Sequence, residues 1–146
     1  MPIPAKRQVN SPPFMGKMPS LNSDAQIDQM AFKVNTATKL TDYTVKASET
    51  GTFFTNRGTT AAVNFTLPAV ASGLNYLFYA AADRAITVTP AAADTIICDD
   101  NVAADALALS TGSEIMGGAI QVVCDGVKWV AMTYLEESQT AVVTSA

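Results

Sequence analysis

Apolar and polar side chains alternate along most of residues 42–135, and turn-forming residues interrupt the alternation about every 8–12 residues. Segments 63–67 and 86–89 show the pattern most plainly, and a proline follows each of them. A period of two indicates strands with one buried face, and no helical pattern separates these strands. We therefore predict a mainly β fold. The expected architecture is an antiparallel β-sandwich or barrel, jelly-roll-like, with seven or eight short strands.

The clearest hairpin signal lies near the end of this β-domain. Ile120–Cys124 and Val127–Tyr134 flank Asp125-Gly126, a dipeptide that favours a two-residue turn with positive φ angles. Such a turn sets three cross-strand pairs, namely Cys124 with Val127, Val122 with Trp129, and Ile120 with Ala131. We predict that all six side chains share the buried face, because paired residues of a hairpin point to the same side.

Two segments remain open between alternatives. Residues 99–112 fit either a helical turn or a strand, because Leu107 and Leu109 suit both patterns. Residues 136–146 form a small, polar tail, in which Val142-Val143 could add an edge strand.

The first 41 residues differ from the β-domain. Five of the seven prolines lie in residues 1–20, so this stretch cannot form a helix or an interior strand. Ser23 and Gln26 form a capping-box pair before an apolar stripe with helical spacing, which predicts one short helix near 23–34. The chain thus divides into an extended N-terminal arm (1–41), a β-domain (42–135) and a C-terminal tail (136–146).

The arm is the predicted partner-binding region. Residues 1–46 contain six of the nine basic residues, whereas residues 47–146 contain ten of the thirteen acidic residues. A basic arm favours contact with an acidic surface, such as that of a neighbouring copy, although a solvated arm is the alternative. The arm lacks a run of Lys or Arg, so no nucleic-acid partner is expected. The predicted partner-binding residues are Phe14, Met15, Met18, Leu21, Ile27, Met30, Lys6, Arg7 and Lys17.

The absence of histidine excludes Ser-His-Asp and Cys-His catalysis and all His-containing zinc sites. Cys98 and Cys124 are either two buried thiols or a disulfide. The sequence shows no catalytic, cofactor-binding or metal-binding constellation, and we do not expect an enzyme. A solvated acidic loop is favoured over a calcium site for four aspartates, Asp94, Asp99, Asp100 and Asp105, because they lack the usual loop spacing.

Two further candidate features have simpler explanations. Tyr76 and Trp129 could form a sugar-binding platform, but the hairpin register favours a core role. The uncharged stretch 58–82 is long enough to span a membrane, but polar residues and a proline interrupt it. The first residues contain no apolar signal segment. We therefore expect no membrane partner and synthesis in a cytoplasm.

The order of motifs over residues 42–135 resembles a β-module of tailed-bacteriophage structural proteins. This module recurs in small capsid decoration (cement) proteins and in parts of head and tail fibres. The motifs that carry the resemblance are Phe-Thr-Asn-Arg-Gly at 54–58, Asn-Phe-Thr-Leu-Pro-Ala at 64–69, Gly-Leu-Asn-Tyr-Leu-Phe at 73–78, Ile-Thr-Val-Thr-Pro at 86–90 and Asp-Gly-Val-Lys-Trp at 125–129.

The resemblance implies a virion structural role, and often a homotrimer. The chain has no long shaft, so we expect a decoration protein on the capsid exterior rather than a fibre. Its arm would contact the major capsid protein and neighbouring copies, after synthesis in the bacterial host cytoplasm. A head or tail fibre, or a receptor-binding module, is the alternative.

Overall fold

The computed structural model describes residues 34–109 and 115–145, which belong to one compact unit. The predicted helix near 23–34 falls outside these residues except for Val34, so it stays a prediction. The described strands are β1 (Asn35–Thr38), β2 (Tyr43–Thr44), β3 (Thr52–Thr55), β4 (Val63–Thr66), β5 (Asn75–Tyr79), β6 (Ile86–Thr89), β7 (Ile96–Cys98), β8 (Asn101–Ala104), β9 (Ala106–Leu109), β10 (Ala119–Cys124), β11 (Trp129–Tyr134) and β12 (Ala141–Thr144). A 3₁₀ turn at Ala47–Glu49 links β2 to β3.

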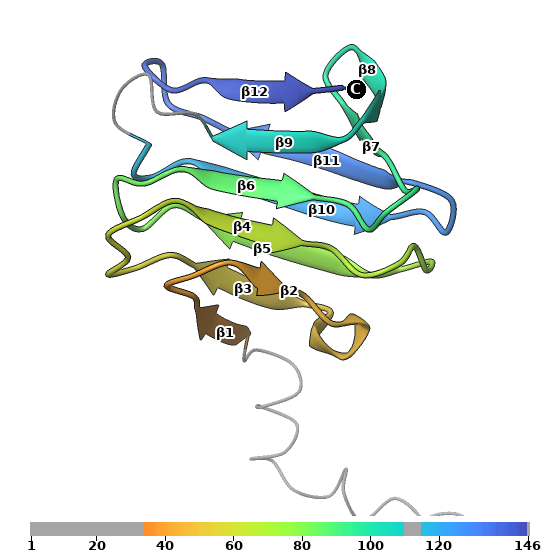
Figure 1. Cartoon of the computed structure of the whole chain (residues 1–146), viewed down its shortest axis with the longest axis horizontal. Helices are drawn as coiled ribbons and strands as arrows, with labels where there is room; N and C mark the ends of the chain where they lie inside the picture. Colours follow the sequence, from red (N-terminus) through yellow and green to blue (C-terminus); the bar gives the residue numbers. More distant parts are fainter. Residues whose placement is uncertain (1–33, 110–114, 146) are drawn as a thin grey trace, which may run out of the picture. The chain divides into compact units, whose positions relative to one another are not determined.

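The strands form two sheets that face each other (Figure 1). The seven-stranded sheet has the order β1-β3-β5-β10-β11-β7-β8, and the five-stranded sheet has the order β12-β9-β6-β4-β2. The predicted mainly β sandwich is confirmed.

The prediction that the sheets are antiparallel is wrong, because both sheets are mixed. From β1 to β6 the chain alternates between the two sheets, strand by strand. A strand and its next neighbour in the same sheet therefore run in the same direction, which makes β1-β3-β5 and β2-β4-β6 parallel. Among the strands that follow β6 in the chain, most pairs are antiparallel, and β10 pairs in this way with both β5 and β11.

Strand positions agree with the sequence pattern in most places. The strand alternative is confirmed for Asn101–Ala104 and Ala106–Leu109, and the edge strand at the tail is confirmed as Ala141–Thr144. The sheet also includes Asn35–Thr38, which the sequence analysis placed in the arm. The predicted strand after Tyr43 ends at Thr44, although Val45 is buried as the alternation required.

The hairpin between β10 and β11 has a different register from the predicted one. Cys124 pairs with Trp129, so the turn centres on Gly126-Val127, one residue later than expected. The Asp125 carboxylate explains the shift, because it accepts hydrogen bonds from the backbone N–H groups of Val127 and Lys128, each at 2.8 Å. Val127 is therefore 74% exposed rather than buried. The three corrected pairs are Cys124 with Trp129, Val122 with Ala131 and Ile120 with Thr133.

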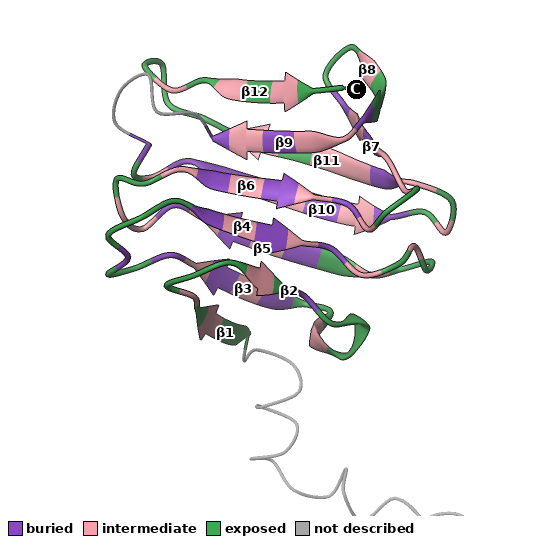
Figure 2. Cartoon of the chain, in the orientation of Figure 1, coloured by how far each residue is buried: buried purple, intermediate pink, exposed green. Residues whose placement is uncertain are grey.

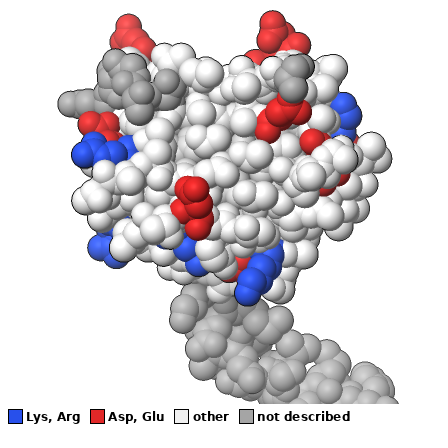
Figure 3. Space-filling model, in the orientation of Figure 1, with Lys and Arg blue, Asp and Glu red and all other residues white. Residues whose placement is uncertain are grey.

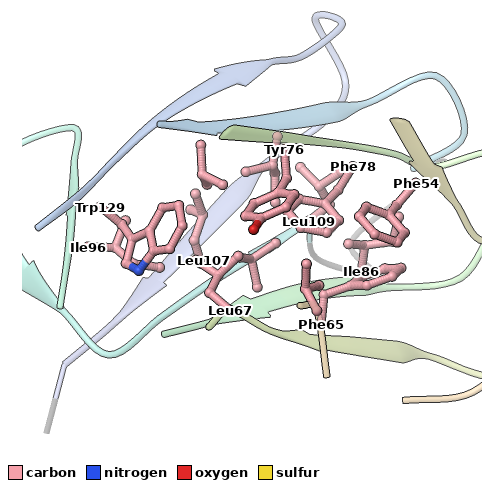
Figure 4. Packing of buried hydrophobic residues seen from close by; sticks show 14 of the residues in the cluster. Phe54, Phe65, Leu67, Tyr76, Phe78, Ile86, Ile96, Leu107, Leu109 and Trp129 are labelled. Atoms are coloured by element: carbon pink, nitrogen blue, oxygen red, sulfur yellow. The ribbon is translucent and has the colours of Figure 1, made fainter. Parts of the chain in front are cut away.

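The core lies between the two sheets and is rich in aromatic rings (Figure 4). Phe54 from β3, Phe65 from β4 and Phe78 from β5 are fully buried, with ring centroids 4.7–5.6 Å apart. Burial alternates along these strands, so that each strand has one side in the core and one outer side (Figure 2). Aromatic burial on this scale supplies much of the apolar area that stabilises a domain of this size.

Asn56 links two turns through its buried side chain. Its Oδ1 accepts hydrogen bonds from Ala81 N (2.8 Å) and Ala82 N (2.9 Å). Its Nδ2 donates to Arg84 O at 3.0 Å, and to Ala82 O at 3.4 Å. The sequence Asn-Arg-Gly at 56–58 is typical of an ordinary turn. The structure shows instead that Asn56 joins the β3–β4 turn to the β5–β6 turn.

Candidate protein-interaction faces

Charged side chains are absent from the strands. None of the twelve strands within the described residues contains Lys, Arg, Asp or Glu. The charged residues of this part of the chain lie instead in the loops, the turns and the 3₁₀ helix. Isolated β-domains usually place charges on their edge strands and outer faces, where they oppose association with other sheets. Both broad faces of this sandwich lack that protection.

The outer side of the seven-stranded sheet is apolar and aromatic. We call it the apolar outer face, and its central residues are Phe53, Leu77, Tyr79, Gln121, Val123, Val130, Met132 and Tyr134. The strand registers place Phe53, Leu77, Gln121 and Met132 in one row across β3, β5, β10 and β11. A second row contains Val123 and Val130, next to β7.

Contacts within the apolar outer face hold its side chains in place. The rings of Phe53 and Tyr79 stack with centroids 5.7 Å apart, and the Tyr134 hydroxyl donates to Gln121 Oε1 at 2.8 Å. Met132 and Tyr134 are 44% and 51% exposed. A hollow of about 210 Å³ lies at one end, lined by residues that include Val34, Phe53, Leu77 and Gln121. The hollow is wide enough for one apolar side chain, and its lining also includes the polar residues Thr52, Asn75 and Gln121.

The outer side of the five-stranded sheet has a different chemistry. We call it the threonine face, and its residues are Thr44, Asn64, Thr66, Thr87, Thr89, Ala108 and Val142. Asn64 Oδ1 accepts a hydrogen bond from the Thr89 hydroxyl at 2.8 Å, so these two polar groups of the face bond to each other. Figure 3 shows the molecule from this side, where uncharged atoms cover most of the surface. Most charged side chains lie toward its outline, but one acidic group lies near the middle of the view.

The predicted partner-binding residues of the arm are not part of the described structure. All nine, Phe14, Met15, Met18, Leu21, Ile27, Met30, Lys6, Arg7 and Lys17, lie before Val34. The other residues singled out from the sequence can be placed. Tyr76 and Trp129 are 1% and 0% exposed, with ring centroids 5.8 Å apart, so the core interpretation is confirmed and a sugar-binding platform is excluded for them.

Cys98 and Cys124 are buried free thiols, so the disulfide alternative is wrong. Burial raises the pKa of the Cys98 thiol to about 11, and the charge of Asp99 and a hydrogen bond to its carboxylate act in the same direction. A thiol with this pKa is protonated near neutral pH and is a poor nucleophile or metal ligand.

The acidic loops have no metal-binding arrangement in the structure. Across residues 34–109 and 115–145, no group of three or more Cys, Asp or Glu side chains could hold a metal ion. Asp94 uses one carboxylate oxygen to accept a hydrogen bond from Val70 N at 3.2 Å, which ties the β6–β7 loop to the β4–β5 loop. Among the same residues, no helix has the length and apolar character needed to cross a membrane.

Sequence reasoning missed the two uncharged outer faces, although part of their signal was present. The alternation identifies outward residues, and none of those within the twelve observed strands is charged, whereas the predicted strands also included Lys46 and Lys128. What the alternation does not reveal is which strands lie side by side. The row from Phe53 to Met132 exists only because β3, β5, β10 and β11 are neighbours in one sheet.

A scan against models of protein families finds no match to this chain, and a search of curated proteins finds no significant similarity.

Proposed function

We propose that this protein is a non-enzymatic structural component of a bacteriophage virion that binds the outside of the capsid and stabilises the shell. The observation that carries the assembly role is the absence of charged side chains from all twelve described strands. A domain with two broad uncharged faces and uncharged edge strands is suited to being covered by other subunits. The phage assignment itself is supported by the motif resemblance over residues 42–135.

Two features of the chain support this role. Residues 34–109 and 115–145 form a compact β-sandwich, and the sequence before them is rich in apolar and basic side chains. In the proposed role the major capsid protein is the principal partner, and neighbouring copies of this chain are the second. The arm residues Phe14, Met15, Met18, Leu21, Ile27, Met30, Lys6, Arg7 and Lys17 make the contacts with the shell. Docking of the arm would bury apolar side chains at a cost in chain entropy.

Copy number per virus particle tests this role directly. Quantitative mass spectrometry of purified particles should find many copies, in a fixed ratio to the major capsid protein. A handful of copies per particle would favour the alternative, a head or tail fibre or a receptor-binding module. Absence from the particles would contradict the proposal.

A truncation tests the arm separately. Removal of residues 1–33 should weaken cosedimentation with capsids that lack the protein, while the β-sandwich remains folded. The truncation must stop before Asn35, because β1 pairs with β3 and forms an edge of the seven-stranded sheet. Undiminished binding of the truncated protein would contradict a role of the arm in docking. Circular dichroism of both proteins provides the folding control.

A further inference from the structure

We infer that the apolar outer face is the surface through which one copy of this chain packs against a second copy. The inference rests on the proposed function in treating the chain as part of an assembly, and it adds the surface by which copies meet. Three observations carry it: the size of the face, the absence of charge on it, and the acidic character of the rest of the domain.

The size of the face suits a specific interface. The four neighbouring strands that carry the face, β3, β5, β10 and β11, are spaced about 4.8 Å apart with about five residues each, and cover roughly 19 Å by 17 Å. Two copies packed face to face would therefore cover about 650 Å² of flat area in total, to which side-chain relief and the flanking strands β1 and β7 add. With these additions the contact approaches the roughly 1,000 Å² expected of a biological interface, whereas a small anchoring peptide would leave most of the face uncovered.

The charge distribution favours a second copy over a charged partner. Residues 34–109 and 115–145 contain five basic and ten acidic residues, so two copies repel each other in most orientations. The central residues of the apolar outer face carry no charge, so this orientation brings no like charges together across its centre. A nucleic acid or a strongly basic protein would instead require a charged complementary surface.

The chemistry of the face is also self-complementary. A two-fold contact places the same residues on both sides, so apolar side chains of one copy pack against apolar side chains of the other. Leu77 on β5 and Met132 on β11 flank Gln121 on the central strand β10. Both side chains are therefore near the middle of the proposed contact, where substitutions have their largest effect.

The oligomeric state of the isolated full chain tests this inference without any capsid. Sedimentation velocity and light scattering coupled to size exclusion should show an oligomer at micromolar concentration. Met132→Lys and Leu77→Lys should each raise the dissociation constant at least about 100-fold. Thr87→Lys is the matched control, because it places the same charge on the threonine face and should leave the dissociation constant unchanged.

Salt distinguishes this contact from association of the basic arm with an acidic body. A contact through the apolar outer face should persist between about 50 and 500 mM salt, because screening affects only the repulsion between distant acidic loops. A monomeric wild-type chain would overturn the inference. An oligomer that dissociates as the salt concentration rises would also overturn it. The same holds for an oligomer that Thr87→Lys disrupts and Met132→Lys does not. Failure of the capsid role would leave these measurements unaffected, so the two proposals can fail separately.

Discussion

Replacement of Asn56 by alanine tests whether one buried side chain holds two turns of the sandwich together. The variant loses three hydrogen bonds of 2.8–3.0 Å and a longer one of 3.4 Å. Each intramolecular hydrogen bond contributes about 1 kcal/mol, and buried groups left without a partner add a penalty. We expect Asn56→Ala to lower the free energy of unfolding by about 3–4 kcal/mol, a large share of the stability of a small domain.

Urea unfolding followed by fluorescence measures this effect, because Trp129 is the single tryptophan and is fully buried. With a urea dependence of about 2 kcal/mol per molar, the midpoint should fall by roughly 2 M. Asn75→Ala is the matched control, since its side chain is exposed and bonds only to Thr50 and Gly73, and its midpoint should change by less than about 0.5 M. Equal shifts for the two variants at the same protein concentration would refute the reasoning.

Three further predictions follow from the core. Phe54→Ala should destabilise the domain by about 3–5 kcal/mol, and Phe53→Ala, on the outer side of the same strand, by less than half as much in urea unfolding. Burial raises the pKa of Tyr76 to about 12. The stability associated with this shift is present below about pH 10 and is lost as the pH rises toward 12, so unfolding midpoints should fall in that window, and less steeply for Tyr76→Phe. Cys98 and Cys124 should react with a thiol reagent at pH 8 only after unfolding, and two thiols per chain should then be titrated; rapid reaction of the native protein would contradict their burial.

The alternation of side chains predicted most strands and their buried sides, but it could not predict their partners. Segments 63–67 and 86–89 were predicted as strands, and their apolar residues Phe65 and Val88 are buried, yet nothing in the pattern states that β4 and β6 are parallel neighbours. A repeat signal was available, because the segments around Phe65 and Val88 each end before a proline. The predicted register of the β10–β11 hairpin was wrong for a local reason. The Asp125 side chain formed hydrogen bonds that moved the turn by one residue, which kept the inward side of both strands and exposed Val127.

The candidate site was harder to predict than the fold. Partner binding was predicted for the arm, because apolar and basic residues gather there. The candidate interaction faces come from residues such as Leu77 and Met132, which are far apart in the sequence and meet only through the sheet order. Single outward apolar residues are common on protein surfaces and carry little information by themselves. Their arrangement in rows, without an intervening charge, is the informative feature.

The alternation of β1 to β6 between the two sheets also determines how the sandwich responds to force. A load applied at Val34 reaches β1 first, and β1 is an edge strand held by a ladder of four residue pairs to β3. Once β1 detaches, β2 follows as the edge of the opposite sheet, where it pairs with β4 through two residues. Successive strands can thus peel away in chain order, alternately from one sheet and then the other. We therefore expect a pull at Val34 to detach these strands one at a time before it reaches the β5–β10–β11 centre.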